Sequence, residues 1–158
     1  MPIHRANVAG YAILLLALAS YGQDKKPSVV LPKGAVRDLT KLCSRPGPPK
    51  FDATWQPTEI DVRAMESRLS RVSLLQARGV PSVQGARIEH PDQYFRQYVG
   101  IVVDKRKLIY INAFCDMVPR DNWREHSVDV CDGGGCFWGV VYDTTTREFS
   151  DLEINGIA

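Results

Sequence analysis

Four cysteines constrain this chain most, because any pairing among them joins segments that lie far apart in the sequence. They are Cys43, Cys115, Cys131 and Cys136. Disulfides persist in oxidising compartments, whereas cytosolic thiols stay reduced. Whether these four cysteines are expected to be paired therefore depends on whether the start of the chain directs export.

The beginning of the chain has the pattern of a secretory signal peptide. His4 and Arg5 precede an apolar run from Val8 to Ala19, which ends in small residues typical of a cleavage site. The run has about 12 residues, short of the roughly 20 that a membrane-spanning helix needs. We therefore expect residues 1–19 to be a leader that is removed, and the mature protein to be periplasmic or secreted with paired cysteines.

Charge and composition narrow the classes of partner. Without the leader the chain has 19 basic and 18 acidic residues, a net charge of +1. Such a balance offers no basic surface for nucleic acid or anionic lipid. The hydrophobic content of 44% is ordinary for a globular chain. We expect one domain, no nucleic-acid partner and no stable membrane insertion after leader removal; the oligomeric state stays open.

Residues 20–57 are expected to form an extended arm rather than a domain. They contain six prolines, which interrupt helices and central strands. The first half of the arm, to about Lys41, is expected to be loose. Cys43, Phe51 and Trp55 are the residues able to fix its second half to a core.

A single amphipathic helix is predicted at the start of the remaining domain, residues 58–158. Thr58 is a suitable N-cap, and acidic residues follow it in the first turn. Apolar residues then recur at intervals of three and four as far as Val72, which predicts a helix from about Glu59 to Ala77. Gly79 would end it.

The rest of the domain predicts an antiparallel sheet. β-Branched and aromatic residues alternate with short polar turns and indicate four strands, at Tyr94–Val103, Leu108–Cys115, Cys136–Tyr142 and Glu148–Ile154. A short edge strand is also expected near Ser127–Val130. The predicted fold class is α+β, with one amphipathic helix packed on a four-stranded antiparallel sheet in a cystatin-like layout, an analogy that implies no function.

The strand pattern favours one of the three possible disulfide pairings. If Cys115 lies opposite Cys136, the next three pairs are apolar and lie on one face of the sheet. Those pairs are Ala113 with Trp138, Ile111 with Val140 and Ile109 with Tyr142. Cys43 would then join Cys131 and fix the arm. The main alternative joins Cys131 to Cys136 and Cys43 to Cys115.

Metal and catalytic sites have weaker support. Zinc held by cysteines and His126 would need short paired spacings that the cysteines lack. Between Asp129 and Cys136, three glycines could bind an anion and Asp129 with Asp132 could bind calcium, but neither motif is complete. A turn with positive φ beside a disulfide is the favoured interpretation. We therefore predict no catalytic residue, no metal and no other cofactor.

Recognition is expected on the longest connection between strands, Asp116 to Val130. Loops on a rigid sheet are common recognition sites, and this loop holds a tryptophan among charged residues. The candidate binding residues are Trp123 as the anchor, with Arg124, His126 and Asp132. The alternative is that Trp123 folds back onto its own core.

Several C-terminal segments resemble those of small exported bacterial proteins of uncharacterised function. The segments are Tyr98-Val-Gly-Ile, Leu108-Ile-Tyr, Val130-Cys-Asp-Gly-Gly, Phe137-Trp-Gly-Val-Val-Tyr-Asp and Phe149-Ser-Asp-Leu-Glu-Ile-Asn-Gly. This resemblance covers about residues 94–156, implies export and a strand-rich domain, and brings no activity with it.

The leading functional hypothesis is an exported, disulfide-stabilised binding module whose partner is another protein. One alternative is an enzyme inhibitor or immunity protein, which would need a protruding loop. The second alternative is a small hydrolase, which would need a deep pocket that brings His126 or His90 close to an acid.

Overall fold

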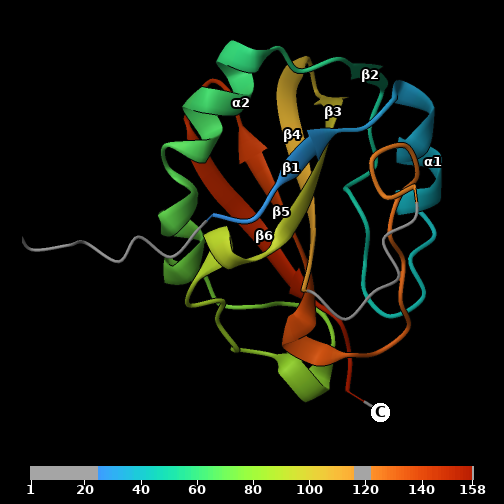
Figure 1. The fold of residues 1–158 in the computed structure, drawn as a ribbon, viewed down its shortest axis with the longest axis vertical. Coiled ribbons are helices and arrows are strands. Elements are labelled where there is room, and N and C mark those ends of the chain that lie inside the picture. Colours follow the sequence, from blue (N-terminus) through green and yellow to red (C-terminus); the bar gives the residue numbers. More distant parts are fainter. Residues whose placement is uncertain (1–24, 116–121, 158) are drawn as a thin grey trace, which may run out of the picture.

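The computed structural model describes residues 25–115 and 122–157 (Figure 1). The predicted leader and the first part of the predicted recognition loop lie outside the described residues. The strands are β1 Ser28–Val30, β2 Ala53–Trp55, β3 Phe95–Val103, β4 Arg106–Phe114, β5 Phe137–Asp143 and β6 Glu148–Ile154. The helices are α1 Val36–Leu39 and α2 Glu59–Glu66, and the 3-10 turns are η1 Lys33–Ala35, η2 Leu69–Leu74, η3 Pro81–Val83, η4 Pro91–Gln93 and η5 Gly134–Cys136.

The fold is α+β, as predicted, with a larger and mixed sheet. Strands β3 to β6 form the predicted antiparallel meander in chain order. Two further strands pair with the outer edge of β3, β1 in parallel and β2 antiparallel. The expectation of four strands was therefore wrong in number. Both added strands have three residues and lie at the edge of the sheet, where proline-rich sequence is tolerated and hydrophobic alternation is too short to detect.

The register between β4 and β5 is the one that the apolar pattern predicted. Ile111 lies opposite Val140, and Ala113 lies opposite Trp138. Just beyond the ladder, the Cys115 amide donates to the Cys136 carbonyl over 3.0 Å. The structure pairs Cys115 with Cys136 and Cys43 with Cys131. The alternative pairing is not the one that forms.

The predicted helix begins where expected. The Thr58 hydroxyl accepts a hydrogen bond from the Asp61 amide, and the Asp61 carboxylate accepts one from the Thr58 amide over 2.8 Å. This capping box satisfies two backbone donors that the first turn would otherwise leave free. The side-chain hydrogen bond from Thr58 lowers the pKa of Asp61 below its ordinary value.

The helix ends earlier than predicted. Helix α2 stops at Glu66, and residues 69–74 form a 3-10 turn instead of continuing the α-helix to Ala77. Two serines explain the change, because the Ser67 and Ser73 hydroxyls donate to carbonyls three residues earlier and so compete with α-helical bonding. The apolar spacing of three between Leu69 and Val72 also suits the three-residue repeat of a 3-10 helix.

Both faces of the sheet are covered (Figure 1). One face packs against α2 and η2 through a core that includes Tyr98, Ile111 and Trp138. The opposite face packs against the arm, whose Leu31, Val36 and Leu39 meet Val99, Ile101, Tyr110 and Val141. The expectation of one helix covering one face was therefore incomplete.

From residue 25 onward, the first half of the arm is not loose. It contributes β1, η1 and α1, and it supplies four of the nine buried residues of the second core. Burial of these side chains offsets the entropy of ordering a segment with little regular structure. Within the described residues, no helix has the length and apolar character needed to cross a membrane.

Candidate functional site

The structure describes the predicted recognition loop from Asn122 to Val130, and the irregular backbone continues to Asp132. We call residues 122–132 the loop. It lies against the arm-covered face of the sheet. It contains no strand, so the edge strand expected near Ser127–Val130 was wrong. Its backbone groups bond instead to side chains of the sheet, which removes the need for a strand partner.

Trp123 is buried, with 4% of its surface exposed. Its ring packs edge-on against Phe95 and Phe114, at centroid distances of 5.5 and 5.8 Å. Aromatic pairs in this geometry stabilise a core beyond the area that they bury. Trp123 therefore folds back onto its own core, as the alternative predicted, and its role as the anchor of a partner stays a prediction.

Gln97 and Asn112, which lie in the sheet, form hydrogen bonds to the backbone of the first half of the loop. The Gln97 amide nitrogen donates to the carbonyls of Trp123 and His126, and its oxygen accepts from the Val128 amide over 2.9 Å. Asn112 donates to the Val128 carbonyl over 2.8 Å. Both amide side chains are almost completely buried, so they bond to the loop where water would not reach.

Asn155 holds the second half in the same way. Its amide nitrogen donates to the carbonyls of Val130 and Asp132, at 2.6 and 2.8 Å. Asn155 follows β6 directly and is fully buried. Together, the three amide side chains make six hydrogen bonds to the loop backbone.

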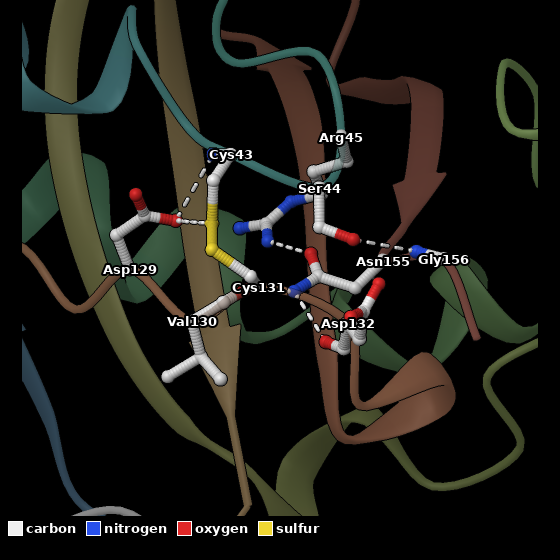
Figure 2. The surroundings of a disulfide bond; sticks show 9 residues. All are labelled: Cys43, Ser44, Arg45, Asp129, Val130, Cys131, Asp132, Asn155 and Gly156. Carbon is white, nitrogen blue, oxygen red and sulfur yellow. Dashed lines mark hydrogen bonds between the residues drawn. A yellow bond between two sulfur atoms is a disulfide. The ribbon is translucent and has the colours of Figure 1, made fainter. Parts of the chain in front are cut away.

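Arg45 is buried and contacts two of these side chains, Asn112 and Asn155. Figure 2 shows it beside Asn155. Its guanidinium donates to the side-chain oxygens of Asn112 and Asn155 and to the Trp138 carbonyl. An arginine has donors only, so it fixes which end of each amide faces it. Both NH₂ groups are thereby directed to the loop. We call Arg45, Gln97, Asn112 and Asn155 the polar clamp.

Cys43 and Ser44, which precede Arg45 in the chain, also connect the arm to the loop and to the end of β6. Cys43 is joined to Cys131, and its amide donates to the Asp129 carboxylate over 3.4 Å. The Ser44 hydroxyl accepts from the Gly156 amide over 2.9 Å, as Figure 2 shows. Three consecutive arm residues therefore connect the loop, the end of β6 and the sheet.

The glycine-rich segment is the turn that its sequence predicted. Asp132, Gly133 and Gly134 all have positive φ, at 65°, 85° and 52°. Asp132 is half-buried and its carbonyl is taken by Asn155. All four cysteines are in disulfides. Among the residues that the structure describes, no group of three or more His, Cys, Asp or Glu side chains is arranged to hold a metal ion.

The outer side of the loop presents charged side chains. Arg124, Glu125 and His126 are exposed, and the Arg124 guanidinium lies 4.9 Å from the centre of the Trp123 ring. Of the four predicted binding residues, Arg124 and His126 are thus accessible on the loop surface. Cation–π contact with a tryptophan face holds the arginine head near the protein.

The loop forms a groove with η1 and α1, which sequence reasoning missed. Its volume is about 430 Å³, and it is lined by Pro32, Gly34, Ala35, Asp38, Glu125 and His126. The two sides of this groove are about 90 residues apart in the chain, and they meet because the arm covers the sheet. The predicted Cys43–Cys131 bond brings the arm to the end of the loop. No sequence pattern indicated that residues 32–38 would line a groove with Glu125 and His126.

His90 lies elsewhere, in a second depression of about 370 Å³. Glu66, Ser67 and Asp92 line this depression too. The Glu66 carboxylate already accepts from the Tyr98 hydroxyl and from Arg96. No hydrogen bond joins the His90 imidazole to a serine or a carboxylate within residues 25–115 and 122–157. His90 thus shares a depression with acidic residues, as a hydrolase would need, but it has no hydrogen bond to any of them among the described residues.

No protein-family model matches the chain, and the searches of curated proteins and of solved structures return no match.

Proposed function

We propose that this protein is an exported, disulfide-stabilised binding module that recognises another protein through the groove between the loop and η1–α1. One observation carries the proposal: four buried polar side chains hold a loop of irregular backbone while its charged residues face outward. A loop fixed before binding loses less conformational entropy when it binds.

The disulfides support the proposed compartment. Cys43–Cys131 and Cys115–Cys136 leave no free cysteine among the described residues, which fits an oxidising environment. The Cys43–Cys131 bond joins the arm to the loop, the two segments that line the groove. Export itself depends on the predicted leader. The cystatin-like layout expected from the sequence adds no support, since a shared layout does not imply a shared function.

Two glycines allow a matched test of the proposed surface. Gly34 and Gly135 are both exposed, each is the middle residue of a three-residue 3-10 turn, and an added Cβ would meet no atom within 4 Å at either position. Gly34 lines the groove, whereas Gly135 lines a different depression, beside Tyr94. A tryptophan should therefore be tolerated at both positions but should obstruct the groove only at 34.

The experiment captures partners from an extract of the cells that carry the gene, with the wild type, Gly34→Trp and Gly135→Trp. We expect Gly34→Trp to lose about tenfold or more of the captured partner, and Gly135→Trp to retain it. Melting temperatures of the three proteins control for folding. Equal capture by both variants, or loss with Gly135→Trp alone, would overturn the proposed surface.

A partner with enzymatic activity would make the protein an inhibitor or immunity protein. Addition of the purified protein should then lower that activity, and Gly34→Trp should not. The hydrolase alternative has less support, because Ser67 and Ser73 direct their hydroxyls to carbonyls of their own segment. A hydrolytic activity of the wild type that is lost in His90→Ala would favour it over binding alone.

A further inference from the structure

The groove between the loop and η1–α1 is lined by two carboxylates. Asp38 belongs to α1 and Glu125 to the loop, and both are exposed; Pro32, Ala35 and His126 line the same groove. Among the described residues, neither carboxylate has a salt bridge. Both charges are therefore available to an incoming group.

A second groove with the opposite charge lies on the other side of Gly34. It has a volume of about 360 Å³ and shares Gly34 with the first groove. Lys33 and Arg37 line it, above apolar Val36 and Phe51. Gly34 thus lines both an acidic groove and a basic one, and no atom lies within 4 Å of the position that a Cβ would take there.

Long basic side chains match the acidic groove. Lysine and arginine lay their aliphatic stems on apolar surface and keep their charged heads near carboxylates and water. A head group between Asp38 and Glu125 would be attracted by two carboxylates, while its stem covered Pro32 and Ala35. An aspartate or glutamate side chain on the same partner would suit Lys33 and Arg37.

We infer that the protein partner inserts a lysine or arginine side chain into the acidic groove and places an acidic residue over the basic one. This inference rests on the proposed function and names the chemistry of its partner. Electrostatic complementarity of this kind directs encounter and fixes orientation, and it weakens as salt rises.

The inference is tested first with a defined probe. The peptide acetyl-Gly-Arg-Gly-amide is titrated into the isotopically labelled protein and followed by NMR, and the same peptide with citrulline in place of arginine is the uncharged control. We expect saturable shifts of the Gly34, Asp38 and Glu125 amides, and an affinity at least about fivefold weaker for citrulline. Equal binding of the two peptides, or shifts confined to other residues, would overturn the inference.

A variant separates this inference from the proposed function. Asp38→Asn combined with Glu125→Gln removes both charges with little change of shape, and Glu148→Gln on the exposed side of β6 is the matched control. We expect the double variant to lose most of its binding to the arginine peptide and to the captured partner, and the control to lose none. Capture that is abolished by Gly34→Trp but unchanged in the double variant would contradict the inference and leave the proposed function standing.

Discussion

At the scale of single residues, the polar clamp depends on the unusual position of Arg45. A buried charge normally needs a partner, and here the partners are two amide oxygens and a backbone carbonyl. Hydrogen bonds from a charged donor are stronger than those between neutral groups. Arg45 therefore both stabilises the site and sets the orientation of Asn112 and Asn155.

Replacement of Arg45 by methionine should lower the free energy of unfolding by about 2–3 kcal/mol, because two buried amide oxygens lose their donor. Arg124→Met, which removes only an exposed cation–π contact, should cost less than about 1 kcal/mol. Urea unfolding of both variants measures the difference. Equal losses would mean that Arg45 does not organise the site.

A second prediction at this scale concerns Gly139. A Cβ added at Gly139 would lie 2.1 Å from the Tyr110 hydroxyl oxygen, inside a rigid pair of strands. Gly139→Ala should therefore destabilise the fold by about 1–3 kcal/mol through overpacking. Tyr110→Phe should recover part of that loss, and a double-mutant cycle by urea unfolding measures the coupling. Additive effects of the two changes would contradict the contact.

At the scale of elements, the positions of the long strands could be predicted from the sequence, and those of the short strands could not. Strands β3 to β6 span seven to nine residues, and short polar turns mark their ends. This was enough to predict their positions and the Cys115–Cys136 pairing. Strands β1 and β2 have three residues each and are defined by their neighbours. The clamp was not predictable, because it joins residues whose proximity only the tertiary fold creates.

The capping box of α2 gives a pH-dependent prediction. Because the pKa of Asp61 is lowered in the folded state, its ionised form stabilises the fold above the unfolded-state pKa, near 3.8, and this contribution is lost as the pH falls through the lower folded-state value. Asp61→Asn should thus be less stable than the wild type at pH 7, and this difference should be smaller at about pH 3. Unfolding curves at both pH values test this, and a constant difference would contradict it.

At the scale of the whole molecule, the two disulfides differ in the sequence separation of the cysteines that they join. Cys43 and Cys131 are 88 residues apart in sequence, and Cys115 and Cys136 are 21 apart. The first bond joins the arm to the loop. The second joins the end of β4 to the start of β5. The groove depends on the first bond, because its two sides belong to the arm and to the loop.

Removal of each bond by paired serine substitutions should show this difference. In the chain-entropy model, loss of Cys43–Cys131 costs about 4–5 kcal/mol and loss of Cys115–Cys136 about 3 kcal/mol. We also expect faster amide exchange in residues 31–39 and 122–132 only when the first bond is removed. Faster exchange of both segments on loss of Cys115–Cys136 alone would argue against this division.

In the proposed function, a partner protein binds over the groove that the clamp holds in place. Site-specific photo-crosslinking tests this most directly, with a benzophenone amino acid placed at Gly34 or, as the control, at Gly135, in the cells that carry the gene. We expect a specific crosslinked product from position 34 that is absent from position 135. A product from position 135 alone, or the same products from both positions, would contradict it.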